Sequence, residues 1–183
     1  PSAAVAWRVH NEGFMEPLSE TLTRLKIRGS WGITGNQEIG DFQYSRLFEL
    51  SNQRARVQFG DEFITTIRPS AVDQDLKWEE TTSYNIGADY GLFGGRISGS
   101  IEYYRKETND LLFSSIVPAG ANLSDQVLTN VGSVRNTGVE FSVDAAVYET
   151  DDFSYNARFN ASTNDNELTK LTNFSSGVRT GGI

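Results

Sequence analysis

The sequence has no cysteine and only one histidine and one methionine among its 183 residues. Without cysteine, a disulfide framework and thiolate chemistry are excluded. The single histidine, His10, lies beside an expected turn, and a Ser-His-Asp triad would have to be built around it. The spacings of glycine-rich phosphate loops are also missing. We therefore predict that the protein is not an enzyme and binds no cofactor.

Long hydrophobic runs and an excess of positive charge are missing as well. No stretch reaches the length of about eighteen apolar residues that a transmembrane helix needs. The formal net charge of -8 argues against a nucleic-acid partner, because surfaces that bind phosphate backbones are basic. Two acidic stretches, Asp73–Asp75 and Asn164–Glu167, lack the spacing of a calcium loop. We interpret them as solvated charge and expect no metal site.

What the sequence does contain is a strict alternation of apolar and polar residues. It is clearest from Thr81 to Arg105, where a two-residue period runs on both sides of Phe93–Gly95. Successive side chains of a strand point to opposite faces, so this period predicts a β-hairpin and rules out an amphipathic helix. The residues on its apolar parity are Tyr84, Ile86, Ala88, Tyr90, Leu92, Ile97, Gly99, Ile101 and Tyr103.

The same period predicts four further strands, at Ser2–Val9, Leu25–Ile33, Gly138–Tyr148 and Phe153–Thr163. Strands of roughly nine to eleven residues are long for a soluble protein and match a tilted membrane-spanning strand. The first, third and fifth connections are compact, and the first should hold a helical turn capped near Ser19. The second, fourth and sixth are long, which is the asymmetry of an up-and-down outer-membrane barrel.

Aromatic and charged residues fit this interpretation. Aromatic residues gather beside the short turns and toward the long connections, as two interfacial girdles would require. The girdle residues are Tyr90, Phe93, Phe153 and Tyr155 at the short turns, and Trp31, Tyr84 and Tyr103 at the other end. Charged residues on the polar parity are interpreted as a network that keeps a barrel lumen wet, rather than as a substrate path. They are Lys26, Arg28, Asp89, Arg96, Glu102, Glu140, Asp144 and Arg158.

The predicted fold is therefore all-β, an antiparallel up-and-down transmembrane β-barrel. An open sheet in lipid would leave its edge N–H and C=O groups unsatisfied, so a barrel has to close. Single-chain bacterial barrels begin at about eight strands, and about six are predicted here. We expect residues 1–183 to be a segment of one larger barrel domain. Its long extracellular loops are expected near residues 34–80, 108–136 and 164–183.

Several motifs, in order, resemble the SusC/RagA-like TonB-linked outer-membrane transporters of Bacteroidetes. They are LKIRGSWGITGNQ from Leu25 with Ile39-Gly40, LKWEETTSY from Leu76 running on into NIGADYGLFGGRISGSIEYYRKETNDLL, NVGSVRNTGVEF from Asn130, and the late NARFNASTNDNELTKL. These motifs cover nearly the whole chain, so they are more specific than any single match.

The resemblance implies part of a 22-stranded TonB-dependent receptor barrel that imports glycans or peptides across a Gram-negative outer membrane. It implies a SusD-like surface lipoprotein as partner, contact with outer-membrane lipid, and energy from the TonB–ExbB–ExbD system. Because the 183 residues show no plug domain, TonB box or final barrel strand, coupling to TonB is expected to run through a part outside them.

Import receptors capture substrates at the outer mouth, so we expect ligand contacts on the long loops. The candidates are Phe42, Tyr44, Asn109, Asp110, Phe113 and Asn122. Trp78 is expected to play a structural part where a strand begins. Alternation alone also describes a soluble β-sandwich carbohydrate-binding module, which remains the alternative. A secreted hydrolase that uses the carboxylates of Asp89 and Glu102 is a more distant option.

Overall fold

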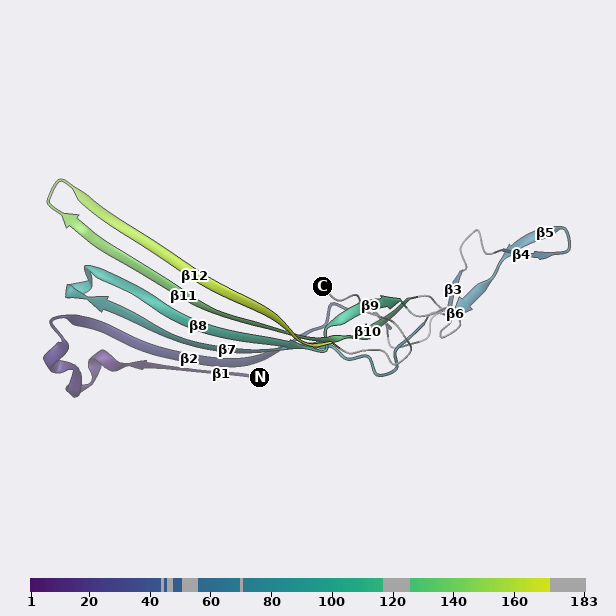
Figure 1. Cartoon of the computed structure of the whole chain (residues 1–183), viewed down its shortest axis with the longest axis horizontal. Coiled ribbons are helices and arrows are strands. Elements are labelled where there is room, and N and C mark those ends of the chain that lie inside the picture. The colour runs from purple at the N-terminus through teal and green to yellow at the C-terminus, as the bar shows by residue number, and fades with distance from the viewer. Residues whose placement is uncertain (44, 46–47, 51–55, 70, 117–125, 172–183) are drawn as a thin grey trace. The chain divides into compact units, whose positions relative to one another are not determined.

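Most of the chain forms β-structure (Figure 1). The computed structural model describes residues 1–43, 45, 48–50, 56–69, 71–116 and 126–171. Its main sheet has six strands in the order β1-β2-β7-β8-β11-β12, so each strand lies beside the next long strand along the chain. Their bounds are β1 Ser2–Arg8, β2 Leu22–Asn36, β7 Glu79–Leu92, β8 Ile97–Asn109, β11 Gly132–Glu149 and β12 Ser154–Leu171. This order confirms the predicted up-and-down arrangement.

The compact connections lie together at one end of this sheet (Figure 1). Two 3-10 helices, η1 (Val9–Asn11) and η2 (Gly13–Leu18), join β1 to β2. A third, η3 (Phe93–Gly95), joins β7 to β8, and Gly94 and Gly95 take the positive φ angles that this tight turn requires. Residues 150–153 join β11 to β12, where the Thr150 N–H donates to the Phe153 carbonyl.

The predicted cap at Ser19 is wrong. Ser19 follows the end of η2, and its hydroxyl donates to the carbonyl of Glu16 at 2.7 Å. It therefore satisfies a carbonyl at the end of a helical turn rather than an N–H at the start of one. A helix after Ser19 has no room, because β2 already begins at Leu22.

Several strands run further than the apolar alternation predicted. β2 continues to Asn36 and β12 to Leu171, through mostly polar stretches that lack the apolar alternation. Backbone pairing needs only N–H and C=O groups, so a ladder can continue where side chains no longer alternate. No helix among the described residues is long and apolar enough to cross a membrane.

The long connections carry short hairpins of their own. β3 (Phe48–Leu50) pairs with β6 (Ile67–Pro69), and β4 (Arg56–Phe59) pairs with β5 (Glu62–Thr65). In the connection after β8, β9 (Leu112–Ile116) pairs with β10 (Gln126–Asn130). The chain thus divides into two compact units. The first is Pro1–Thr34, Thr81–Thr108 and Val134–Leu168, and the second is Gly35–Glu80, Asn109–Ser133 and Thr169–Ile183.

The six-stranded sheet of the first unit has two chemically different faces. Residues opposite each other in a ladder share a face, and the β8–β11 register pairs Glu102 with Glu140 and Ile101 with Phe141. The Phe141 and Phe159 rings contact each other at a centroid distance of 6.5 Å, which extends the same facing to β12. We call the side with Ile101 and Phe141 the apolar face, and the side with Glu102 and Glu140 the polar face.

The apolar face is open rather than packed. Ile86 is 64% exposed and Phe159 is 59% exposed, although burying such a side chain typically contributes about 1.5 to 3 kcal/mol. The buried apolar residues among those described are Val9, Met15 and Val127, and none of them lies on a strand of the main sheet. This face therefore needs an apolar environment that these residues do not supply.

On the apolar face, one tyrosine side chain lies over a glycine of the neighbouring strand and forms a hydrogen bond with the strand beyond it. Tyr90 of β7 lies over Gly99 of β8, and its hydroxyl donates to the Ser142 carbonyl on β11 at 3.2 Å. A methyl group at Gly99 would lie 2.6 Å from the Tyr90 hydroxyl oxygen and would overlap the Ser142 carbonyl. Tyr90, predicted as a girdle residue, thus fills the space above a close approach of two strands.

The polar face repeats this arrangement near the other end of the sheet. Tyr104 of β8 lies over Gly138 of β11, and its hydroxyl donates to the Asn164 side chain on β12 at 3.2 Å. A methyl group at Gly138 would lie 2.5 Å from the Tyr104 hydroxyl oxygen. Each tyrosine therefore ties three consecutive strands together through one glycine.

Replacing Gly99 by alanine should destabilise the sheet by about 1 to 3 kcal/mol, because the added methyl group overpacks the β8–β11 contact. The matched control is Gly29→Ala on the same face, where the nearest atom to the added carbon is Val5 Cγ1 at 3.7 Å. The measurement is urea unfolding of the full-length protein. Equal unfolding midpoints for the two variants would contradict the close packing of Tyr90 over Gly99.

Candidate functional site

On the polar face, a charged network joins three neighbouring strands. Arg28 of β2 contacts Asp89 of β7 through Nε at 3.5 Å and Glu102 of β8 through Nη2 at 2.6 Å. Lys26 Nζ lies 3.7 Å from Asp89, and the Asn85 amide donates to Glu102. The network contains two cations and two carboxylates, so its charges balance. This confirms part of the polar network predicted from the sequence.

A glycine on β7 again allows a side chain, here that of Arg28, to extend from β2 to β8. The Arg28 guanidinium lies across Gly87 of β7, where an added Cβ would be 3.1 Å from Cζ. A side chain at Gly87 would stand in the path from β2 to β8. The arginine therefore spans three strands in the same way as the two tyrosines.

Further along the same face, hydroxyl and amide groups lie among the charged residues. The Ser100 and Ser142 hydroxyls lie 2.8 Å apart, and Arg158 donates to Asp144. A shallow polar groove is lined by Ser100, Glu102, Glu140, Ser142, Asn160 and Ser162, among others. Within the part of the chain that the structure describes, Glu140 makes no hydrogen bond or ion pair. The hydroxyl, amide and carboxylate groups of this groove can form hydrogen bonds with water or with a polar ligand.

The described residues also contain no group of three or more histidine, cysteine or acidic side chains placed to hold a metal ion. His10 contacts the backbone of β2 instead, with Nδ1 at 2.9 Å from the Leu25 carbonyl oxygen. That contact fastens the turn after β1 to the adjacent strand. Nothing in these contacts resembles a catalytic triad.

In the second unit, two polar side chains hold the roots of the long connections. Glu79 accepts from the Leu112 N–H and from the Asn36 side chain, each at 2.9 Å. Asn130 accepts from the Lys77 N–H at 2.8 Å and donates to the Lys77 and Asp110 carbonyls at 2.9 and 2.6 Å. Four chain segments are therefore fastened at one place.

A third contact adds to this attachment. The Thr129 hydroxyl donates to Asp73 at 2.5 Å, and Thr129 itself is buried. Asp73 also accepts from the Asp75 N–H at 2.9 Å, so this acidic stretch is used in local hydrogen bonding. The base of the hairpin β9–β10 is thus held against residues 73–79.

Three of the predicted ligand residues lie in the turn and hairpin that these contacts support. Asn109 ends β8, Asp110 follows it with a φ angle of 56°, and Phe113 lies on β9 with its side chain 61% exposed. Asp110 can take the left-handed conformation at lower cost than most residues, and Asn130 binds its carbonyl. The structure brings these three together at the start of one hairpin.

Phe42 is the other predicted residue that the structure describes. It is 61% exposed and has a φ angle of 59°, while its carbonyl accepts from the Ser45 N–H at 2.9 Å. Backbone strain at a non-glycine residue often marks a functional position. Tyr44 and Asn122 lie outside the described residues.

Sequence reasoning missed Glu79 and Asn130. Both lie inside motifs quoted above, LKWEETTSY and NVGSVRNTGVEF, but their contacts join residues far apart in the sequence. Trp78, expected to be structural, directly precedes β7 and is 56% exposed. The only sign of the roles of Glu79 and Asn130 in the sequence was that each is a polar residue near the start of a quoted motif.

Comparisons with known proteins give a consistent result. Residues 1–182 match the family model described as TonB dependent receptor-like, beta-barrel. The chain is 44% identical to the TonB-dependent receptor SusC of Bacteroides thetaiotaomicron over 173 residues, 94% of this chain. It is 37% identical to the TonB-dependent receptor P26 of Formosa agariphila over 93% of the chain. The chain spans 17% of the length of each of these two relatives.

Solved structures agree in both fold and sequence. The structure of the RagAB peptide transporter matches with a TM-score of 0.75 and 31% identity, covering 96% of this chain and 18% of that one. The RagAB peptide importer in its 'open-open' state matches with a TM-score of 0.76 and 29% identity, covering 97% and 18%. The chain therefore belongs to the TonB-dependent receptor family, as a segment of a SusC/RagA-like transmembrane β-barrel.

Proposed function

We propose that this chain is part of an outer-membrane transporter that imports nutrients in a TonB-dependent manner. The observation that carries the proposal is the two-faced sheet, with Ile86 and Phe159 exposed on one side and a charged network on the other. Outer-membrane barrels place apolar residues toward lipid and polar residues toward the lumen. The family membership supports the same assignment.

The substrate is a glycan or a peptide, captured at the outer mouth of the barrel with a SusD-like lipoprotein. The resemblance to SusC and to the RagAB peptide transporter supports a large polar substrate and a two-component system. Energy comes from the TonB–ExbB–ExbD system through parts of the protein outside these residues. Ligand contact is assigned to Phe42, Asn109, Asp110 and Phe113, with Tyr44 and Asn122 on the same connections.

Two other functions are less well supported. A soluble β-sandwich carbohydrate-binding module needs its apolar faces packed together, whereas the apolar face here has large exposed side chains such as Ile86. A hydrolase would need the carboxylates of Asp89 and Glu102 to act on a substrate, but both bind Arg28. Transport without catalysis accounts for both observations.

Placing arginine at Ile101 in the full-length protein should reduce the amount of folded barrel in the outer membrane. A cation on the lipid face costs about 2 to 4 kcal/mol at the bilayer midplane. The matched control is Ser100→Arg, one residue earlier on the polar face and close to Glu102 and Glu140. The measurement is the heat-modifiable folded fraction in outer-membrane preparations. Equal folded fractions for Ile101→Arg and wild type would show that the facing is wrong.

Replacing both Phe42 and Phe113 by alanine should raise the substrate concentration needed for half-maximal uptake by about tenfold. An exposed aromatic contact typically contributes about 0.5 to 1.5 kcal/mol, so two such losses give an effect of this size. Uptake is measured in cells that grow on the glycan or peptide and depend on the full-length transporter. Phe63→Ala, with a side chain 62% exposed in the same unit, is the control.

Loss of uptake when TonB is removed is expected for the wild type. If the double variant at Phe42 and Phe113 reached half-maximal uptake at the same substrate concentration as the wild type, the loop assignment would be wrong. Wild-type uptake that survives without TonB would contradict the transport mechanism itself.

A further inference from the structure

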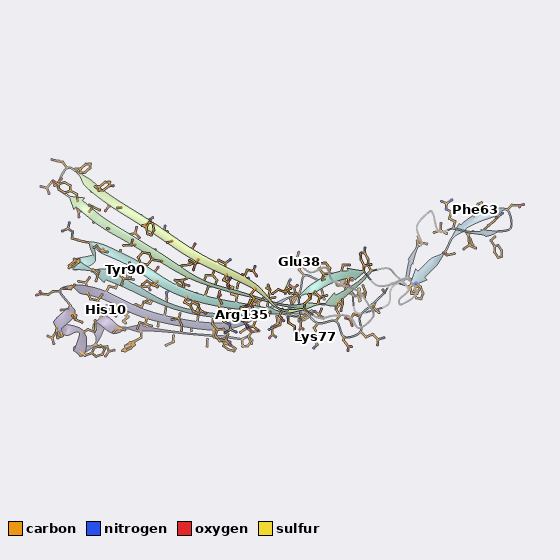
Figure 2. The ribbon with its side chains drawn as sticks, viewed as in Figure 1. His10, Glu38, Phe63, Lys77, Tyr90 and Arg135 are labelled. Carbon is orange, nitrogen blue, oxygen red and sulfur yellow. The ribbon has the colours of Figure 1, made fainter. Side chains whose placement is uncertain are left out.

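Toward one end of the sheet, the side chains on the apolar face of β8, β11 and β12 change from apolar to charged. Along β8 it is apolar through Tyr103 and then carries Arg105 and Glu107. The β8–β11 register pairs Glu107 with Arg135, and β12 presents Glu167 to Arg135. We call these four charged residues the boundary cluster. Arg135 lies near the opposite end of the sheet from His10 and Tyr90 (Figure 2).

This level is where a barrel leaves the hydrocarbon of the membrane. Tyr84 and Tyr103 are the last aromatic residues of the apolar face on β7 and β8 toward this end of the sheet. Aromatic residues at this position typically lie at the height of the lipid headgroups. Under the proposed function, this end carries the long connections and faces outward, so the boundary cluster lies at the outer leaflet.

The boundary cluster holds more donors than its own carboxylates use. Arg105 Nη2 lies 2.9 Å from Glu107 Oε2, and Arg135 Nε lies 3.8 Å from the same oxygen. Each guanidinium has five N–H groups, so two arginines share one carboxylate oxygen with most donors unused. Among the described residues, the buried side-chain polar atoms without a hydrogen-bond partner are the Nε atoms of Arg105 and Arg135.

The remaining acidic partner binds weakly. Arg135 Nη1 lies 3.4 Å from Glu167, whose side chain is 61% exposed, and exposed ion pairs contribute little. Glu107 accepts a hydrogen bond from Arg105 and lies near Arg135, so one carboxylate holds both arginines in place. The two guanidinium groups are thereby kept side by side and about one-third to two-fifths exposed.

An apolar groove lies beside this cluster, across β1, β2 and β7. Gly29 leaves a depression lined by Val5, Trp31, Tyr84 and Ile86, and its lining is almost entirely apolar. Tyr84 belongs to this groove and lies on β7, which pairs with the Arg105 strand β8 and contacts it at this end through the Thr81 and Thr108 hydroxyls. Paired cations at the membrane boundary, followed by an apolar groove, match the headgroup and the acyl chain of an anionic lipid.

We propose that Arg105 and Arg135 bind a phosphate of a phosphorylated glycolipid in the outer leaflet, with one acyl chain in the groove over Gly29. Arginine suits this role because its planar fork of donors matches phosphate oxygens. Phosphate oxygens would take up the donors that the boundary cluster leaves unused. The inference rests on the outer-membrane location in the proposed function.

The test is to purify the full-length barrel from outer membranes in mild detergent and measure the phosphorylated glycolipid that it retains. Arg105→Gln and Arg135→Gln should each lower the affinity for added glycolipid by about tenfold, since each removes a charged hydrogen-bond donor. Lys106→Gln is the matched control. Lys106 directly follows Arg105 on β8, and its replacement removes the same charge from the polar face, where Lys106 lies over the Tyr104 ring.

A second experiment uses only the wild-type protein. Dephosphorylated glycolipid should bind to it about tenfold more weakly than the phosphorylated form. Equal binding of the two forms, or an equal loss in Lys106→Gln, would overturn the proposal. A wild-type barrel found outside the outer membrane would instead contradict the proposed function. A wild-type barrel in that membrane without phosphate-dependent binding contradicts only the lipid site.

Discussion

Backbone hydrogen bonding in lipid is the constraint on which this structure depends. Inside hydrocarbon, each N–H and C=O without a partner costs several kcal/mol, so every spanning strand has to pair with its neighbours. The meander from β1 to β12 meets this requirement between consecutive strands, whereas the outer edges of β1 and β12 need further strands of the barrel. Close strand approach at Gly99 and Gly138, each covered by a tyrosine, strengthens pairing where side-chain packing on an open face is sparse.

The two faces follow from that constraint together with the two-residue period of a strand. That period could be seen in the sequence, so the six strands, their order and the position of Ile101 and Glu102 on opposite faces were predicted correctly. Strand ends were not, because β2 and β12 continue through mostly polar stretches that lack the alternation. The cap at Ser19 was wrong because a polar residue can satisfy either end of a helical turn.

The candidate site was predictable only in part, since it depends on contacts across long sequence separations. Exposed aromatic residues on the long connections, such as Phe113, could be proposed from composition and position alone. The support beneath them could not, because Glu79 binds Leu112 and Asn130 binds Lys77 across 33 and 53 positions. No local pattern encodes such pairs, and the family resemblance concerns the fold rather than these individual bonds.

The facing of the sheet is the central claim, and cysteine accessibility along β8 tests it most directly. The 183 residues contain no cysteine, so single cysteines can be placed at positions 97 to 103 of a cysteine-free full-length protein. In intact outer membranes, a water-soluble maleimide should label positions 98, 100 and 102 but leave 97, 101 and 103 unlabelled. Labelling without this alternation, or with the opposite parity, would contradict the account.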